Sequence, residues 1–128
     1  MTTIKIVEGQ NEISNEAGLQ IIGSTAPNQS GLSPRELLEA ALGLCVSISL
    51  QKIMDYDKVE YDKSSIGVEV KATKAADGTN RFSNFNVQVK LPSTLDETYK
   101  KKLMSVVERA CTIGNTLKEG AVIETIEI

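Results

Sequence analysis

The segment from residue 33 to residue 56 constrains the fold most, because it is the longest apolar stretch of the chain. Ser33, Pro34 and Glu36 form the pattern of a capping box with proline at the first helical position. After this start the segment is apolar on almost every side, which is typical of a buried helix. Charged residues in its first turns interrupt it too early for a membrane span. The sequence therefore predicts a central helix wrapped by the rest of the chain, with Cys45 at its middle.

Two later segments alternate apolar and polar residues, which predicts half-buried strands. They run from Ile66 to Thr73 and from Phe85 to Leu91, and the Asp-Gly pair between them favours a tight turn. We therefore expect an antiparallel hairpin. Further strands are expected over Thr2–Val7, Glu12–Ser14, Leu19–Ile22 and Ala121–Ile128, and the first part of Asp57–Ser65 is an additional candidate.

Two more helices are predicted in the last third of the chain. Ser93 and Asp96 mark the start of a helix that continues to about Ala110, with apolar residues recurring on one face. A short helix then opens just after Cys111 and stops at Gly120. Because helices and antiparallel strands occupy separate blocks, the expected fold class is α+β. The length of 128 residues predicts a single domain, residues 1–128.

The composition excludes several function classes. The chain has no histidine, which removes the usual general base, the usual metal ligand and every Ser-His or Cys-His pair. A formal charge of −3 and a pI near 5.0 argue against nucleic acid or an anionic membrane as partner. Polar residues follow Met1, so we expect no signal peptide and a cytoplasmic location. A stable structural disulfide is not expected in that compartment.

Two cysteines in a reducing compartment are either inert core thiols or a redox pair. In sequence terms Cys111 is better placed to ionise, because it stands at a predicted helix N-terminus with Arg109 nearby. Cys45 lies among apolar residues in the middle of a helix, where burial raises the pKa of a thiol. Considered alone, Cys45 is therefore more simply an inert core residue. For the pair, the two interpretations remain equally open.

The motif SPRELLEAALGLC, which ends at Cys45, is followed much later by ACTIGNTLKEG, which contains Cys111. Together they resemble the OsmC/Ohr family of osmotically induced and organic hydroperoxide resistance proteins, over the chain after Gly31. The resemblance implies an intertwined α+β homodimer, in which long buried central helices are wrapped by antiparallel sheets. It also implies a thiol peroxidase that needs no metal or organic cofactor. The same resemblance implies that Cys45 is the peroxidatic cysteine and that Cys111 is the resolving one.

The chemistry implied by this resemblance needs only the two thiols and an external reductant. The Cys45 thiolate attacks a hydroperoxide and becomes a sulfenic acid, which condenses with Cys111 to a disulfide. A cellular dithiol, of lipoyl type, then reduces that disulfide.

The best-known branches of the family hold the thiolate with an N-terminal arginine, oriented by a glutamate just after the proline of the central motif. This chain has no arginine before Arg35, which itself occupies the glutamate position. We rank Arg35 from a partner subunit first as the catalytic cation, ahead of Arg109 and Lys5. The simpler interpretation of Arg35 is a surface charge that pairs with Glu39. Without a close guanidinium, the pKa of Cys45 is expected to stay near or above the ordinary value for cysteine.

Two other functions stay open. The same fold could keep an apolar pocket near Cys45 that binds a small lipid or a thiol-bearing ligand without turnover. Alternatively, the chain could be a purely structural dimer with inert thiols.

Overall fold

The computed structural model describes all residues from 1 to 128, and these form two compact units, residues 1–40 and 41–128. Helix α1 (Pro34–Tyr56) begins in the first unit and continues through the second. The expectation of one domain over residues 1–128 stays a prediction. The observed mixture of helices and small antiparallel sheets confirms the α+β class.

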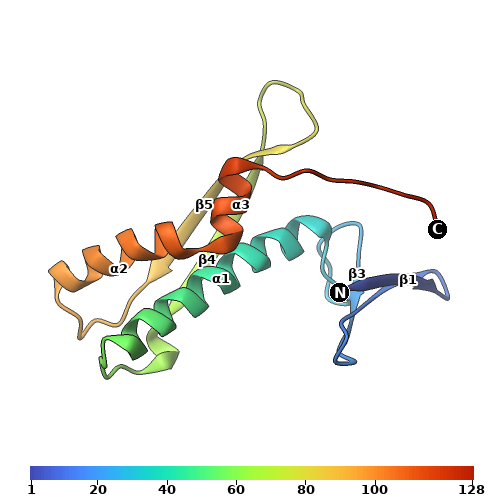
Figure 1. The fold of residues 1–128 in the computed structure, drawn as a ribbon. Helices are drawn as coiled ribbons and strands as arrows, with labels where there is room; N and C mark the ends of the chain where they lie inside the picture. Colours follow the sequence, from blue (N-terminus) through green and yellow to red (C-terminus); the bar gives the residue numbers. More distant parts are fainter. The chain divides into compact units, whose positions relative to one another are not determined.

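The first unit contains a three-stranded antiparallel sheet (Figure 1). Its strands, in the order β1-β2-β3, are β1 (Thr3–Val7), β2 (Gln10–Ser14) and β3 (Gln20–Gly23). Glu8 and Gly9 make the turn between the first two strands, with φ angles of 50° and 79°. The short strands expected in this part of the chain are therefore confirmed, with bounds shifted by one or two residues.

The start of α1 forms the predicted capping box. The backbone N–H of Glu36 donates to Ser33 Oγ at 3.3 Å, and the N–H of Ser33 donates to Glu36 Oε1 at 2.9 Å. The Ser33 hydroxyl also donates to the same carboxylate oxygen at 2.8 Å. These hydrogen bonds from Ser33 lower the pKa of Glu36, because they favour its charged form. The local sequence alone is therefore sufficient to fix where this helix begins.

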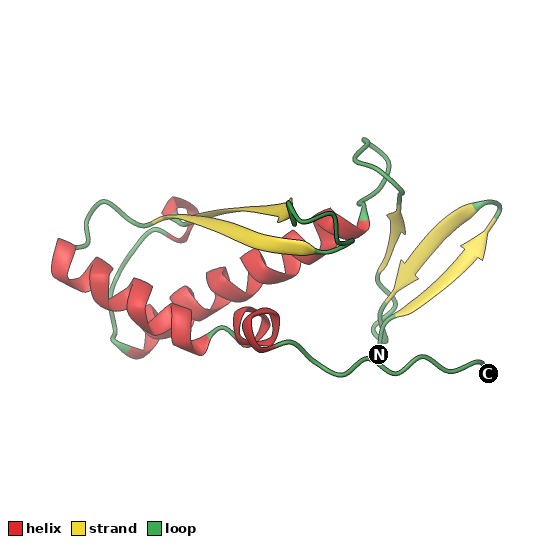
Figure 2. Ribbon diagram, turned by 90° about the horizontal axis from the view of Figure 1, so that it is seen from above, coloured by secondary structure: helices red, strands yellow, loops and turns green.

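In the second unit, a two-stranded hairpin lies along α1 (Figures 1 and 2). Its remaining elements are β4 (Gly67–Lys74), β5 (Phe82–Lys90), α2 (Glu97–Ala110) and α3 (Thr112–Glu119). The hairpin is antiparallel as predicted, with Val70 opposite Val87. Helix and hairpin pack closely at Gly43, where an added Cβ would lie 3.2 Å from Val70 Cγ2. A side chain at this position would require Val70 to shift by a few tenths of an ångström.

One stripe of α1 forms the centre of the core. Residues at four-residue spacing lie on one face of a helix. The buried residues of the main core cluster are Leu42, Val46, Leu50 and Met54 of α1, Leu103 and Val107 of α2, and Cys111. The sequence predicts a helix that is buried on all sides, but within this chain Leu44 is 62% and Ile48 is 42% exposed. One hairpin and α2 cover a single face only, so the prediction was wrong for the single chain.

Two expected strands are not formed. The segment after α1 contains only a short 3₁₀ helix, η1 (Lys63–Ser65), while Val59 and Tyr61 pack against the core. Residues 121–128 are extended without secondary structure (Figure 1). A β-strand needs a neighbouring strand for its backbone hydrogen bonds, so residues 121–128 do not become a strand on their apolar content alone.

By length and composition alone, α1 could cross a membrane, since an 18-residue window in it has a mean hydropathy of 1.5. The prediction that charges in its first turns exclude a membrane span was therefore wrong, as far as length and composition decide. Such a helix is weak evidence by itself, because the core helix of a soluble protein passes the same test. The buried stripe of α1 shows that it serves as a core helix within the second unit.

Candidate functional site

The two cysteines come from distant parts of the sequence, and the fold brings their side chains together. Cys45 lies in the middle of α1. Cys111 lies at the junction of two helices, where it ends α2 and caps the start of α3. Both are free thiols, and they form a hydrogen bond with each other. The second unit alone therefore contains a complete thiol pair.

Cys111 takes the place of a conventional N-cap residue. Its Sγ accepts a hydrogen bond from the N–H of Gly114 at 3.3 Å, and its carbonyl accepts one from Asn115 at 2.9 Å. Its own N–H donates to the carbonyl of Val107 in α2 at 3.1 Å. These contacts hold the side chain in a fixed position, and only 3% of the residue is exposed. The α2–α3 junction is thus built around the Cys111 sulfur.

The environment of Cys45 favours its thiolate. Burial on its own raises the pKa of this thiol, but hydrogen bonds oppose it. The donors are the backbone N–H groups of Ile113 and Thr112, the Cys111 thiol and the Ser49 hydroxyl. Together they outweigh burial and lower the pKa of Cys45 below the ordinary value for cysteine. The start of α3 therefore supplies donors to a sulfur on another helix.

The environment of Cys111 disfavours a second thiolate. Burial raises its pKa most, and the hydrogen bond and charge repulsion from Cys45 raise it further. Hydrogen bonds from the N–H groups of Gly114 and Ile113 lower it only in part. When the pair loses one proton, Cys45 therefore becomes the thiolate and Cys111 stays a neutral thiol.

The sequence predicts that Cys111 ionises more readily than Cys45, and the two pKa shifts have the opposite directions. Cys111 does stand at a helix N-terminus, but two of the N–H groups there also stabilise Cys45. The expectation that the pKa of Cys45 stays near or above the ordinary value was wrong, since the N–H groups of Thr112 and Ile113 perform the role assigned to a guanidinium. Ser49 was not identified from the sequence, although it lies one helical turn after Cys45.

Two of the three cations proposed from sequence occupy other interactions, and the third is exposed. Arg35 forms an ion pair with Glu39, with Nε 3.7 Å from Oε2, as the simpler interpretation expected. Arg109 donates from Nη1 to the Ser105 hydroxyl at 3.1 Å. Lys5 is exposed on β1. None of the hydrogen bonds that lower the pKa of Cys45 comes from a guanidinium or an ammonium group. The role of Arg35 in catalysis stays a prediction.

A cavity of about 560 Å³ lies beside Cys45. Its lining is mainly apolar and comes from α1 and from the α2–α3 junction. The residues are Ala41, Leu44, Cys45, Ile48, Ser49, Lys52, Ile53, Ala110, Thr112 and Ile113. Lys52 is the only charged residue among them. Lys52 was not identified from the sequence, although its spacing of seven residues from Cys45 places both on one face of α1.

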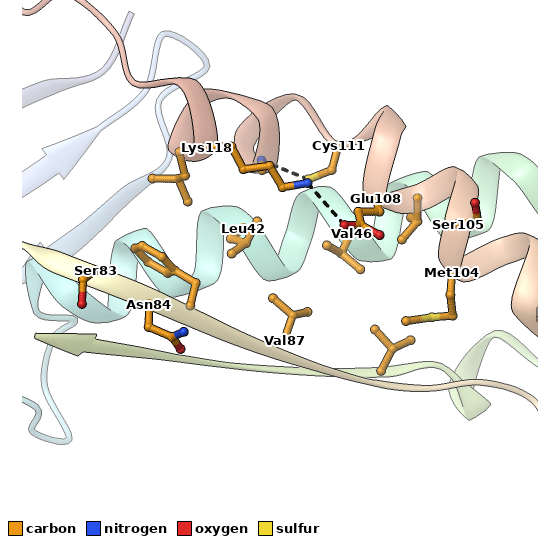
Figure 3. A pocket seen from close by; sticks show the side chains of 15 residues that line it. Leu42, Val46, Ser83, Asn84, Val87, Met104, Ser105, Glu108, Cys111 and Lys118 are labelled. Carbon is orange, nitrogen blue, oxygen red and sulfur yellow. Dashed lines mark hydrogen bonds and ion pairs between the residues drawn. The ribbon is translucent and has the colours of Figure 1, made fainter. Parts of the chain in front are cut away.

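A second cavity, of about 600 Å³, is lined by Cys111 and by residues of α1, β5, α2 and α3 (Figure 3). Its apolar part includes Leu42, Val46, Phe85, Val87, Val89, Met104, Val107 and Leu117. An ion pair joins Lys118 Nζ to Glu108 Oε1 at 3.7 Å within this lining (Figure 3). The structure contains no group of three or more His, Cys, Asp or Glu residues that could hold a metal ion. Each of the two cavities is lined by one of the two thiols, Cys45 in the first and Cys111 in the second.

Comparisons with known proteins agree with this architecture. A family model described as "OsmC-like protein" matches residues 27–126. The chain is similar to the crystal structure of an OsmC-like protein from Mycoplasma pneumoniae, with 18% identity, a TM-score of 0.80 and coverage of 94% of this chain and 87% of that one.

Two further solved structures are named for organic hydroperoxide resistance. OhrB of Bacillus subtilis is 20% identical with a TM-score of 0.62, and the match covers 94% of this chain and 92% of OhrB. The protein from Legionella pneumophila is 14% identical with a TM-score of 0.65, and covers 92% and 89% of the two chains. No curated protein sequence matches the chain. These identities are low, so the structural likenesses show a shared fold.

Proposed function

This chain belongs to the OsmC-like protein family, and we propose that it is a thiol peroxidase that reduces organic hydroperoxides through a Cys45–Cys111 disulfide. The observation that supports this proposal is the hydrogen-bonded thiol pair, in which Cys45 is the more acidic member and lines a cavity. Two proteins of the same fold are named for organic hydroperoxide resistance, which agrees with this activity.

In the first step, the Cys45 thiolate attacks the terminal oxygen of the hydroperoxide. The O–O bond breaks, the other oxygen leaves with its electron pair and takes up a proton, and the product is an alcohol. Cys45 becomes a sulfenic acid, so sulfur is oxidised by two electrons as the peroxide is reduced. The N–H groups of Thr112 and Ile113 favour this step, because they keep Cys45 ionised.

In the second step, the Cys111 sulfur attacks the Cys45 sulfenic acid. The S–OH bond breaks and water is released, which leaves the Cys45–Cys111 disulfide. The two side chains already interact, so this step needs little movement. An external dithiol then returns two electrons to the disulfide. The two proposed oxidation steps use the Cys45 and Cys111 thiols of this chain.

The proposal is tested by adding one equivalent of cumene hydroperoxide to the reduced protein and counting free thiols. Wild type should lose both thiols together and release cumyl alcohol, and mass spectrometry should find a peptide that links Cys45 to Cys111. Cys45→Ser should keep its remaining thiol. Persistent peroxide consumption in Cys45→Ser would overturn the assignment of Cys45. No consumption by wild type at any pH would favour the alternative of a binding module with an apolar pocket.

We also propose that the chain forms a homodimer. Leu44 and Ile48 are exposed one turn apart on α1, next to the cavity at Cys45. Burying an apolar side chain of this size stabilises an assembly by roughly 1.5–3 kcal/mol. Light scattering at micromolar concentration should give twice the mass of 13.9 kDa, and a monomer would contradict the proposal.

The family match supports a protein that is not embedded in a membrane, while the cytoplasmic location stays a prediction.

A further inference from the structure

The two thiols line different cavities. Cys45 lines the cavity of about 560 Å³, whereas Cys111 lines the one of about 600 Å³ (Figure 3). No residue lines both. Helix α1 contributes to both, with Cys45 and Ser49 in the lining of the first cavity and Leu42 and Val46 in the lining of the second.

We propose that the hydroperoxide and the reductant use different cavities: the hydroperoxide reaches Cys45 from the first, and a dithiol on a slender arm attacks the Cys111 sulfur from the second. This inference rests on the proposed function, because it requires the Cys45–Cys111 disulfide as the species that is reduced.

The chemistry of thiol–disulfide exchange selects the sulfur that is attacked. An incoming thiolate bonds to one sulfur and the other sulfur leaves, and a thiolate of lower pKa leaves faster. Cys45 is the better leaving group, because Thr112 and Ile113 donate hydrogen bonds to its thiolate. The incoming sulfur approaches opposite the leaving one, so it needs open space on a side of Cys111 that faces away from Cys45. Cys111 lines the second cavity and Cys45 does not, so we assign the approach of the incoming sulfur to this cavity.

The form of the reductant follows from the burial of Cys111. Only 3% of this residue is exposed, so a thiol fixed on the surface of a folded protein cannot contact its sulfur. A thiol on a flexible, mainly apolar arm can enter a cavity lined by side chains such as Val87, Met104 and Leu117. Lys118 and Glu108, whose side chains are 56% and 73% exposed, provide a polar edge (Figure 3).

The electrons and atoms balance over two exchanges. The first thiolate of the dithiol bonds to Cys111, the Cys45–Cys111 bond breaks, and the Cys45 thiolate is released. The second thiol of the same reductant then attacks its own first sulfur, which closes a cyclic disulfide and releases Cys111, which takes up a proton. The reductant is oxidised by two electrons, and the protein regains both thiols.

A matched pair of substitutions tests the proposal. Met104 lines only the second cavity and is 40% exposed, while Ala110 lines only the first and is also exposed. Met104→Trp should slow reduction of the disulfide by dihydrolipoamide at least tenfold and leave the rate of oxidation by cumene hydroperoxide unchanged. Ala110→Trp should slow oxidation and leave reduction unchanged. The opposite pattern, or equal effects of both variants on reduction, would overturn the proposal.

A trapping experiment on wild type makes the test independent of whether the variants fold. The disulfide is exposed briefly to hexanethiol, and N-ethylmaleimide then stops the reaction. Mass spectrometry should find the alkylthiol on Cys111 and the maleimide on Cys45, and the reverse placement would contradict the inference. If hydroperoxide forms no disulfide, the proposed function fails. The same trapping experiment on a disulfide made with diamide still decides which sulfur is attacked.

Discussion

Cys45, in the middle of α1, and Cys111, at the junction of α2 and α3, both receive backbone hydrogen bonds, but their pKa values move in opposite directions. For Cys45 the donors outweigh the effect of burial. For Cys111 burial and the neighbouring thiolate outweigh the donors. The comparison shows that a helix N-terminus stabilises the sulfur at which its N–H groups converge, and this need not be the sulfur of its own N-cap residue.

Replacing each cysteine in turn should separate their roles most strongly. Cys45→Ser should lower peroxide consumption by at least about 100-fold, since it removes the nucleophile. Cys111→Ser should keep the first oxidation of Cys45 but lose sustained turnover with dihydrolipoamide. Stopped-flow measurement of the first turnover and steady-state consumption distinguish the two. Equal losses of first-turnover rate would mean that Cys111 does more than resolve the sulfenic acid.

The pH dependence of alkylation should show the two thiols directly. Because the pKa of Cys45 is lowered and that of Cys111 raised, Cys45 carries the larger thiolate fraction at neutral pH. Cys45 should therefore react with iodoacetamide about tenfold faster at pH 7, measured by peptide mass spectrometry. Its rate should level off at a lower pH than that of a free cysteine. A rate that still climbs between pH 8 and pH 9 would indicate that burial dominates at Cys45 after all.

A smaller effect is expected from the hydroxyl that donates to Cys45. Ser49→Ala removes one hydrogen bond to the thiolate, which raises the pKa of Cys45 and should slow peroxide reduction about threefold at pH 7. Ser47→Ala is the matched control, because the Ser47 hydroxyl instead accepts a hydrogen bond from Gln51 Nε2 at 3.2 Å. Measuring both rates from pH 6 to pH 9 should show a shift for Ser49→Ala alone. A similar shift in both variants would place the cause in helix stability.

The smallest effect on the thiols should come from the start of α1. Ser33→Ala removes the cap hydroxyl and should lower the free energy of unfolding by about 1 kcal/mol. The alkylation rates of Cys45 and Cys111 should stay unchanged in the folded protein. Urea unfolding measures the first quantity and peptide mass spectrometry the second. A loss of thiol reactivity at unchanged stability would make the helix start part of the active site.

Local sequence was sufficient for features whose partners lie a few residues apart. Ser33 and Glu36 bond across three residues, and they determine the start of α1. Asp77 accepts from the N–H of Thr79 at 3.0 Å, and Gly78 adopts a φ of +82°, which gives the predicted turn of the hairpin. Gly120, with a φ of +76°, ends α3.

The family resemblance carried the assignment of the fold and of the two cysteines, since no local rule joins Cys45 to Cys111. It also implies a guanidinium beside the Cys45 thiolate, and for Arg35 this role stays a prediction. The groups that contact the Cys45 thiol include the N–H groups of Thr112 and Ile113, which every non-proline residue possesses. No residue type marks them in a sequence, so only the placement of α3 against α1 could identify them.

The sequence by itself thus determined where α1 begins, where the hairpin turns and where α3 ends, because capping and turn formation depend on neighbouring residues. Tertiary structure decided which face of α1 is buried, which thiol is more acidic and which cavity each thiol lines. It also decided that residues 121–128 form no strand within this chain. Each of these depends on groups that are distant in sequence and near in space. Burial, hydrogen bonding and charge act over a few ångströms, whatever the number of residues between the groups.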